Sequence, residues 1–246
     1  MIKRFRMVAG PNGSGKSTLA ARLVGDYSVN FYTGLNADEV FAEVSRTRTF
    51  LPPFPIDGAA LAEYAMRTDY ATAEKARFAN GEIVVEADCV CFAGEESVNS
   101  YTVALLVNFL QDECINRGIS FSQETVFSHP SKVAALAKAA SAGYRTYLYY
   151  VATDSPAVNS QRVAERYAQG GHSVPQEKIT ARYVRSLENL PLSVPYLWRA
   201  FFFDNSGLEM RYLASWSKGS GFEFFAPPCE QPAWFRRYAL PAFDVR

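Results

Sequence analysis

A glycine-rich segment near the start of the chain has the residue types and spacing of a phosphate-binding loop. Residues 10–17 fit the pattern G-x-x-x-x-G-K-[ST]. Its glycines let successive backbone N–H groups turn inward toward phosphate oxygens. Lys16 supplies a mobile positive charge, and Ser17 offers Mg²⁺ a hydroxyl at the positive end of a helix. The residues expected to bind the nucleotide are Gly10, Pro11, Asn12, Gly13, Ser14, Gly15, Lys16, Ser17 and Thr18.

Two carboxylates, Asp38 and Glu124, each follow an expected strand. Ligands of open α/β sheets bind beyond the carboxyl ends of strands, so both residues are candidates for chemistry. Asp38 could orient a hydroxyl group and accept its proton late in phosphoryl transfer, for which an ordinary aspartate pKa of about 4 suffices. The alternatives are that Asp38 caps the helix that follows it and that Glu124 pairs with an arginine.

Basic side chains gather on two expected helices, at residues 157–167 and 176–189. Phosphoryl transfer has a loose transition state, so positioning and charge neutralisation dominate its catalysis. We expect Arg162 and Arg182 to supply charge together with Lys16 and Mg²⁺, from a cover over residues 155–185 made flexible by glycines at 170 and 171. A solvated helix face is the alternative for each arginine.

Alternating strands and helices must position these residues, which predicts an α/β fold with a mainly parallel sheet and helices on both faces. Strands are expected at 5–9, 29–33, 119–123, 144–151 and 199–203. Helices are expected at 18–24, 40–44, 58–78, 98–116, 130–142, 157–167 and 176–189. A strand or hairpin is expected at 81–92, a hairpin at 209–225, and an irregular surface segment over the last twenty residues.

The composition indicates a globular protein and excludes several classes. Hydrophobic residues make up 48%, and Lys+Arg and Asp+Glu both number 25, which argues against a general nucleic-acid binder. No apolar run approaches the roughly 18 residues of a membrane span, and the basic start is not followed by a signal-peptide core. The four cysteines lack a C-x-x-C pairing, which favours free thiols in a reducing cytoplasm.

Taken in order, these motifs resemble the zeta-toxin-like P-loop kinases. The resemblance rests on residues 10–18, 36–39, 121–125, 161–172, 179–183 and 204–206. The family phosphorylates a sugar hydroxyl of UDP-N-acetylglucosamine with ATP, and some members are toxins held by an antitoxin. The resemblance implies a five-stranded sheet of order 2-3-1-4-5. It implies that Asp38 faces the acceptor hydroxyl, Glu124 the acceptor's polar groups, and Arg162 the ATP phosphates, with Arg182 as candidate for the second arginine. The acceptor and nucleotide candidates added by these motifs are Asn36, Thr125 and Asn205.

The organisation expected is one P-loop kinase domain over 1–246, with an insertion at about 52–94 and a C-terminal hairpin and tail at 208–246. The insertion is expected to border the acceptor pocket. Nine residues precede the glycine loop, so any antitoxin is expected to be a separate chain. Two other functions stay open: a kinase of another hydroxyl compound, including an antibiotic-type acceptor, and a nucleotide-dependent regulatory ATPase.

Overall fold

The computed structural model describes residues 2–67, 72–168 and 175–243. Its backbone contacts divide the chain into two compact units. The first comprises Met1–Tyr32 and Ser122–Arg246, and the second comprises Thr33–Phe121. Within the described residues, no helix has the length and apolar character that crossing a membrane requires.

The first unit is built on a mixed sheet. Six of the seven strands of this sheet run in the order β10-β9-β8-β7-β1-β6, and the seventh, β2, belongs to the second unit. Parallel pairing joins β1 to β7 and β7 to β8, whereas β9 is antiparallel to β8 and β10 to β9. The strands are β1 (Arg4–Ala9), β6 (Phe121–Thr125), β7 (Arg145–Ala152), β8 (Arg199–Asp204), β9 (Arg211–Ser217) and β10 (Gly221–Phe224).

The expected five-stranded parallel sheet of order 2-3-1-4-5 therefore differs from the observed sheet of seven strands. The reason lies in the hairpin after β8. Its two strands continue the ladder beyond β8, because residues of β9 pair with residues from Arg199 to Asp204. The hairpin itself is confirmed, but it is part of the main sheet and makes the sheet mixed.

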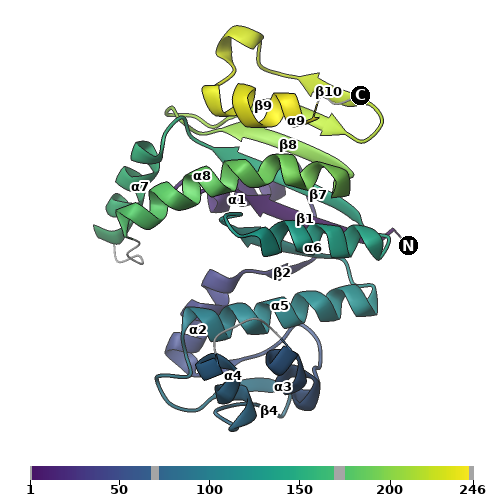
Figure 1. Cartoon of the computed structure of the whole chain (residues 1–246), viewed down its shortest axis with the longest axis vertical. Coiled ribbons are helices and arrows are strands. Elements are labelled where there is room, and N and C mark those ends of the chain that lie inside the picture. The colour runs from purple at the N-terminus through teal and green to yellow at the C-terminus, as the bar shows by residue number, and fades with distance from the viewer. Residues whose placement is uncertain (1, 68–71, 169–174, 244–246) are drawn as a thin grey trace. The chain divides into compact units, whose positions relative to one another are not determined.

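Helices cover both faces of the sheet in this unit (Figure 1). Leu19 and Leu23 of α1 (Lys16–Gly25) pack on one face, against Val8 and Tyr149. The other helices are α6 (Pro130–Ser141), α7 (Pro156–Ala168) and α8 (Gln176–Ser193), followed by a 3₁₀ turn at Val194–Tyr196. The expected elements around the glycine loop are thus confirmed, with bounds shifted by a few residues.

The C-terminal tail is not the irregular surface segment that its prolines predict. It forms a 3₁₀ turn at Pro228–Glu230, a π-helical turn at Phe235–Ala239 and the short helix α9 (Leu240–Phe243). Trp234, Phe235 and Phe243 are buried. The Trp216 indole donates to the carbonyl of Phe243 at 2.8 Å. Aromatic burial outweighs the local breaking effect of the prolines here.

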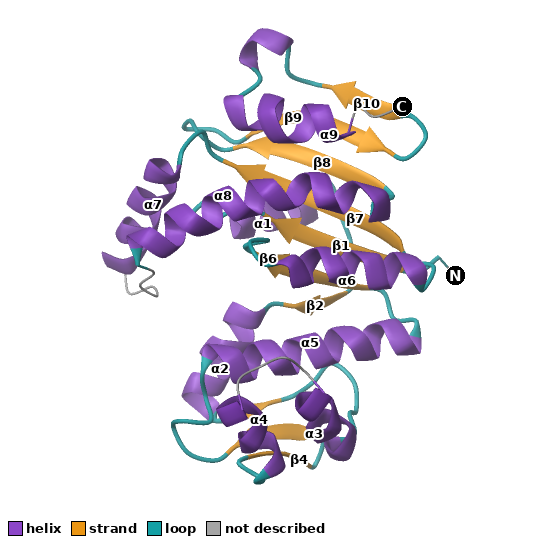
Figure 2. Cartoon of the chain, viewed as in Figure 1, coloured by secondary structure: helices purple, strands orange, loops and turns teal. Residues whose placement is uncertain are grey.

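In its described residues the second unit combines four helices with short strands, which Figure 2 shows in orange. Its elements are β2 (Thr33–Leu35), α2 (Ala37–Thr47), β3 (Thr49–Phe50), α3 (Gly58–Arg67), α4 (Thr72–Ala79), β4 (Ile83–Glu86), β5 (Cys89–Phe92) and α5 (Ser100–Arg117). The segment 81–92 is a hairpin, and β3-β5-β4 form a three-stranded sheet. The helix expected at 58–78 is assigned as α3 and α4, and the residues between them lie outside the described ones.

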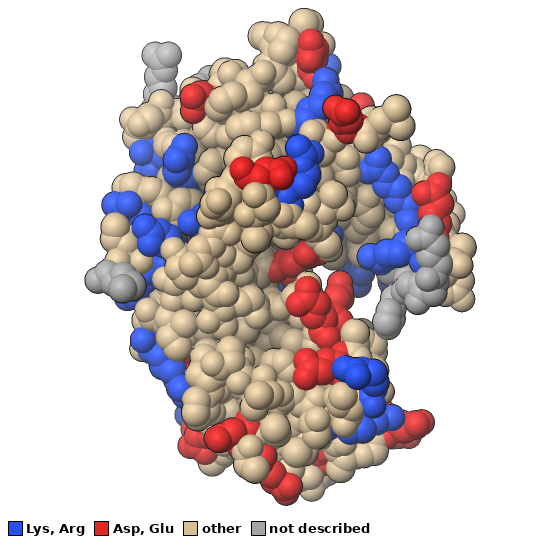
Figure 3. All heavy atoms as spheres, turned by 180° about the vertical axis from the view of Figure 1, so that it is seen from behind, with Lys and Arg blue, Asp and Glu red and all other residues tan. Residues whose placement is uncertain are grey.

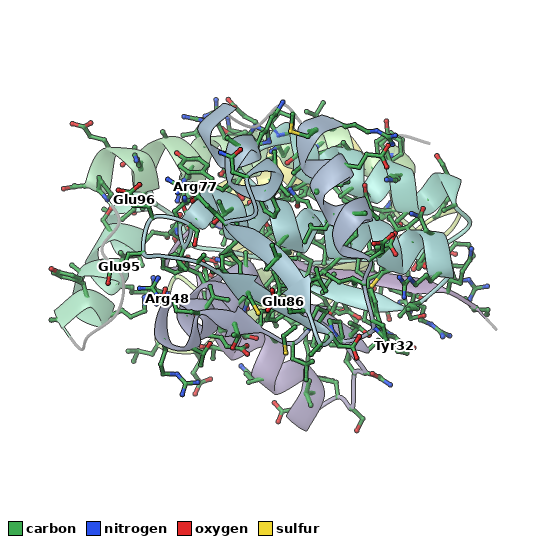
Figure 4. The ribbon with its side chains drawn as sticks, turned by 90° about the horizontal axis from the view of Figure 1, so that it is seen from below. Tyr32, Arg48, Arg77, Glu86, Glu95 and Glu96 are labelled. Carbon is green, nitrogen blue, oxygen red and sulfur yellow. The ribbon has the colours of Figure 1, made fainter. Side chains whose placement is uncertain are left out.

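Ion pairs join residues that flank this hairpin to α4 and to the end of α2, and Figure 4 labels Arg48, Arg77, Glu95 and Glu96. Arg77 lies 2.7 Å from Glu82 and 3.5 Å from Glu96, and Arg48 lies 3.4 Å from Glu95. Glu95 and Glu96 are almost fully exposed, so these pairs contribute little stability individually. The single-domain organisation and the insertion at 52–94 stay predictions.

Candidate active site

The glycine loop lies between β1 and α1, and its backbone needs glycine at three positions. Gly13 and Gly15 have φ values of 74° and 95°, a region that favours glycine. A Cβ on Gly10 would lie 2.0 Å from the carbonyl oxygen of Val151. A Cβ on Gly13 would lie 2.6 Å from the carbonyl oxygen of Asn159. The neighbouring backbone therefore packs directly against the loop and leaves no room for side chains.

Three segments anchor the loop by hydrogen bonds. Gly10 N–H donates to the carbonyl of Thr125 at the end of β6, at 3.3 Å. The Asn159 amide from α7 donates to the carbonyl of Asn12. The Asn205 amide, directly after β8, donates to the carbonyl of Ser14 at 2.9 Å. Because these anchors come from separate elements, the loop has its shape before any ligand binds.

Polar groups of the loop are left available for an anion. Leu19 N–H bonds back to the carbonyl of Gly15 at 2.9 Å. In the described part of the chain, the N–H groups of Ser17 and Thr18 have no backbone acceptor, as is usual in the first turn of a helix. Ser14 is fully buried, and its hydroxyl has no hydrogen-bond partner among the described residues. Buried unpaired donors facing a glycine turn fit a phosphate group.

A carboxylate reaches the loop from β6. The Ser17 hydroxyl donates to Glu124 Oε1 at 3.0 Å. Lys16 Nζ donates to the carbonyl of Pro11 at 3.1 Å, so its ammonium group lies over the loop. A serine hydroxyl and a carboxylate are oxygen ligands of the kind that Mg²⁺ prefers, and Mg²⁺ usually takes few protein ligands beside substrate phosphates. The pair Ser17 and Glu124 therefore fits a magnesium ion bound with a nucleotide.

The predicted arginines differ in their surroundings. Arg162 of α7 donates to the carbonyl of Asn205 at 2.7 Å and to that of Gly207 at 3.3 Å, beside the residue that holds Ser14. Arg182 of α8 is half-buried and has no hydrogen bond or ion pair within the described residues. The glycines at 170 and 171 lie outside the described residues, so the cover over 155–185 stays a prediction. A hollow of about 800 Å³ along α8 is lined by Thr180 and Ala181 of the 179–183 motif but by none of the predicted site residues.

A buried acidic network supports the segment after β8. Asp204 is 1% exposed, and it accepts from the Ser206 hydroxyl at 2.7 Å and from the Trp234 indole at 3.3 Å. Arg211 lies 3.0 Å from the same carboxylate. Ser206 Oγ also accepts from the N–H of Asp154 at 2.8 Å. These contacts fix the backbone on both sides of Asn205.

A pocket of about 420 Å³ opens beside the loop, on the α1 side. Its lining residues are Thr18, Arg22, Asn205, Leu208, Glu209 and Met210. Leu208 is fully exposed, so the pocket offers an apolar surface next to the residue that anchors the loop. The pocket is large enough for an aromatic base, and such a base would lie within reach of Thr18 and Asn205.

The remaining candidates, Asn36 and Asp38, lie in the second unit. The N-cap of α2 is Asn36, whose side chain accepts from the N–H of Asp38 at 3.1 Å, so the alternative that Asp38 caps this helix is wrong. The Asn36 amide donates to Glu39 at 2.9 Å. Asp38 is exposed, and its carboxylate has no hydrogen bond or ion pair within the described residues. Its approach to the glycine loop stays a prediction.

Sequence reasoning missed Asn159 and its partner Thr153. Asn159 is fully buried, and its side-chain oxygen accepts from the Thr153 hydroxyl while its amide holds Asn12. The available signal was its spacing: Asn159 lies four residues before the buried Val163, on the apolar face of α7. A polar residue on a buried face needs partners, and here those partners belong to the nucleotide loop.

Comparisons with known proteins agree with this geometry. Residues 95–191 match the family model described as Zeta toxin, a range that contains Glu124, Arg162 and Arg182 but not the glycine loop. No curated protein matches the chain.

Solved structures share the fold. The AvrRxo1-ORF1:AvrRxo1-ORF2 complex with sulphate ions has a TM-score of 0.59 at 13% identity, over 100% of this chain and 66% of that chain. The same pair with ATP has a TM-score of 0.55 at 13% identity, over 91% and 61%. The PezAT toxin–antitoxin system of the human pathogen Streptococcus pneumoniae has a TM-score of 0.51 at 13% identity, over 85% and 72%.

The present chain thus spans 61 to 66% of the AvrRxo1 chains. At such identities the structural similarity shows the fold alone, whereas the family model adds a match in sequence. Together they confirm what the motifs predicted: the chain resembles the zeta-toxin-like P-loop kinase family.

Proposed function

We propose that this protein is an ATP-dependent kinase that phosphorylates a hydroxyl group of a small molecule. The family match and the fold support a P-loop kinase-type enzyme. The observation that carries the proposal is the pre-formed glycine loop, held by Thr125, Asn159 and Asn205, with the buried Ser14 hydroxyl unpartnered among the described residues. A loop of this kind binds phosphate without reorganising, which favours catalysis by charge stabilisation.

Different parts of the site would bind different parts of the nucleotide. The glycine turn and Lys16 would hold the outer phosphates, and the pocket beside Thr18 and Asn205 would take the nucleoside. A structure of the AvrRxo1 pair was obtained with ATP, which supports ATP as the nucleotide. Mg²⁺ bound with it would supply positive charge to the transferred phosphoryl group.

Ser17 and Glu124 would hold this Mg²⁺, directly or through water. Their 3.0 Å hydrogen bond supports a role for Glu124 on the nucleotide side, besides the role toward the acceptor that the family resemblance implies. In the proposed mechanism Asp38 orients the acceptor hydroxyl and takes its proton late. Arg162 keeps the segment at Asn205 in place and, with Arg182, neutralises phosphate charge as the bond to the leaving group breaks.

For the acceptor we propose a nucleotide sugar such as UDP-N-acetylglucosamine, with Asn36, Asp38, Glu124 and Thr125 as its contacts. The support is the match to the Zeta toxin model. We also propose that an antitoxin in a separate chain controls the enzyme, because PezAT is a toxin–antitoxin system and the AvrRxo1 structures are of two-protein complexes. A regulatory ATPase would instead turn over ATP at a rate that no acceptor changes.

The test is an ADP-release assay with ATP, Mg²⁺ and a panel of hydroxyl acceptors, UDP-N-acetylglucosamine first. Lys16→Ala should fold normally and lose turnover and ATP affinity. Asp38→Asn should bind ATP normally and lose about 10²–10⁴ in rate, the usual effect of removing an oriented base. Glu124→Gln separates the two roles of that residue, because a raised requirement for Mg²⁺ indicates the nucleotide side and a raised KM for the acceptor indicates the acceptor side.

Arg166→Ala is the matched control, since Arg166 is exposed on the same helix as Arg162. Near-normal activity of Lys16→Ala would refute the nucleotide site. Loss of ATP binding in Asp38→Asn, with acceptor binding intact, would show that its role is wrongly assigned.

A further inference from the structure

Four arginines gather on one face of the sheet, at the amino-terminal ends of β1, β7 and β8. Arg4 pairs in register with Arg145, and the row formed by Arg6, Tyr147 and Arg199 lies next to it. Residues directly paired in neighbouring strands project from the same face. These arginines, here called the basic patch, lie at the opposite ends of the strands from the glycine loop.

Aromatic rings hold the guanidinium groups of the basic patch. Arg6 lies 4.6 Å from the centre of the Tyr147 ring, and Arg145 lies 4.3 Å from that of Trp198. Arg199 lies 5.1 Å from the centre of the Phe201 ring. Stacking fixes the planes of the guanidinium groups but does not use their N–H donors. Stacking alone therefore does not occupy the N–H groups that can bond oxygen acceptors.

Three of the four arginines of the patch have no carboxylate partner within the described residues. Within the described residues, Arg6, Arg145 and Arg199 form no ion pair, and the buried Nε atoms of Arg6 and Arg199 have no hydrogen-bond acceptor. Tyrosine hydroxyls are the acceptors instead, that of Tyr149 for Arg6 and that of Tyr32 for Arg4. Figure 3 shows Lys and Arg side chains gathered at the left of the view at mid-height, without Asp or Glu among them. Such clustering is repulsive unless an anionic partner binds.

Exposed apolar side chains of the same unit accompany the patch. Trp198 is 40% exposed, Tyr32 39% and Ile2 44%. Arg, Trp and Tyr are the residue types enriched where protein partners bind most strongly. Aliphatic neighbours such as Ile2 offer a partner's side chains a surface that a sugar–phosphate backbone does not use. The equal totals of acidic and basic residues also disfavour general nucleic-acid steering.

We propose that the basic patch with Trp198 is a docking surface for an acidic segment of a partner protein, whose carboxylates pair with the guanidinium groups. Arginine is suited to this because its planar fork binds a carboxylate through two N–H groups. The surface lies away from the glycine loop, so a partner bound here would leave the candidate active site open. The inference does not depend on the proposed kinase activity.

The test measures fluorescence anisotropy of a labelled peptide rich in Glu and Asp that carries one Leu and one Phe. The full chain should bind it with an affinity that falls as salt rises. Arg145→Glu with Arg199→Glu should weaken binding by about tenfold or more, since each surface ion pair contributes up to about 1 kcal/mol and 1.4 kcal/mol is tenfold. Trp198→Ala should weaken binding without changing its salt dependence.

Arg236→Glu with Arg237→Glu is the matched control, because both are exposed arginines of the same unit and the net charge changes equally. Equal binding by the patch variant and this control would overturn the proposal. The proposal would also be overturned if a single-stranded oligonucleotide of the same charge bound more tightly than the peptide and the patch variant weakened its binding equally. If circular dichroism shows that the double variant does not fold, the single changes Arg145→Gln and Arg199→Gln should still weaken peptide binding. Unchanged affinity of both single variants would refute the proposed docking surface.

Discussion

Replacing Asn159 by alanine tests whether the nucleotide loop depends on a residue outside its motif. The Asn159 amide donates to the carbonyl of Asn12, and its oxygen accepts from the Thr153 hydroxyl. Asn159→Ala removes both bonds and leaves the Asn12 carbonyl without this donor. Two lost bonds at about 1 kcal/mol each, plus a desolvation penalty of about 1–3 kcal/mol for an unsatisfied group, predict a loss of about 3–5 kcal/mol in the free energy of unfolding.

Urea unfolding followed by circular dichroism measures this loss, and titration with ATP measures the effect on the site. We expect ATP affinity to fall by about tenfold, the equivalent of 1.4 kcal/mol, because the turn at Asn12 is no longer held. Asn159→Asp keeps the acceptor for the Thr153 hydroxyl but places a carboxylate oxygen against the Asn12 carbonyl oxygen. Stability and ATP affinity should therefore recover partly at low pH, where a protonated carboxyl can donate.

Gln161→Ala is the control for this series, since among the described residues the Gln161 side chain bonds only the exposed Glu165, and its loss should change stability by less than about 0.5 kcal/mol. If Asn159→Ala unfolds at the same urea concentration as Gln161→Ala and binds ATP normally, the two hydrogen bonds do not support the loop.

Three further outcomes follow from the described contacts. Gly13→Ala should abolish ATP binding, measured by calorimetry, because its Cβ would lie 2.6 Å from a backbone oxygen at a φ of 74°. Burial raises the pKa of the Cys114 thiol to about 12, so one thiol per chain should resist a thiol reagent until urea unfolds the protein; full reaction in the native state would contradict this. Burial, with repulsion from Asp204, raises the pKa of Asp154. The folded state then binds the Asp154 proton more tightly than the unfolded state does. The resulting contribution to the free energy of unfolding is present at low pH and is lost as pH rises from about 4 through the folded pKa. Asp154→Asn should therefore unfold at higher urea than the parent at pH 7 and lose that advantage below pH 4, and a constant difference would refute the assignment.

Local patterns in the sequence were sufficient to predict the part of the fold around the glycine loop. The G-x-x-x-x-G-K-S spacing predicted the strand, turn and helix at residues 4–25, because each glycine answers a local steric demand. Gly118 ends α5 in the left-handed conformation that favours glycine, which is also a local effect. Such features depend on neighbours in sequence and can be predicted from one chain.

Features set by distant residues could not be predicted in this way. No local signal says that β9 and β10 extend the main sheet, because strand pairing is fixed by long-range packing. Four prolines in the tail obscured the burial of Trp234. The partners of Asn159 and Asp204 lie up to 147 residues away along the chain, so their roles become visible only in three dimensions.

The contact between Trp234 and Asp204 bears on how the protein is made. Asp204 fixes the segment that carries Asn205, and Asn205 holds the carbonyl of Ser14. A ribosome adds Trp234 thirty residues after Asp204 and 220 after Ser14. While that tryptophan is still inside the exit tunnel, the nascent chain lacks one of the bonds that support its nucleotide loop. The complete set of supporting contacts can therefore form only after Trp234 has left the tunnel.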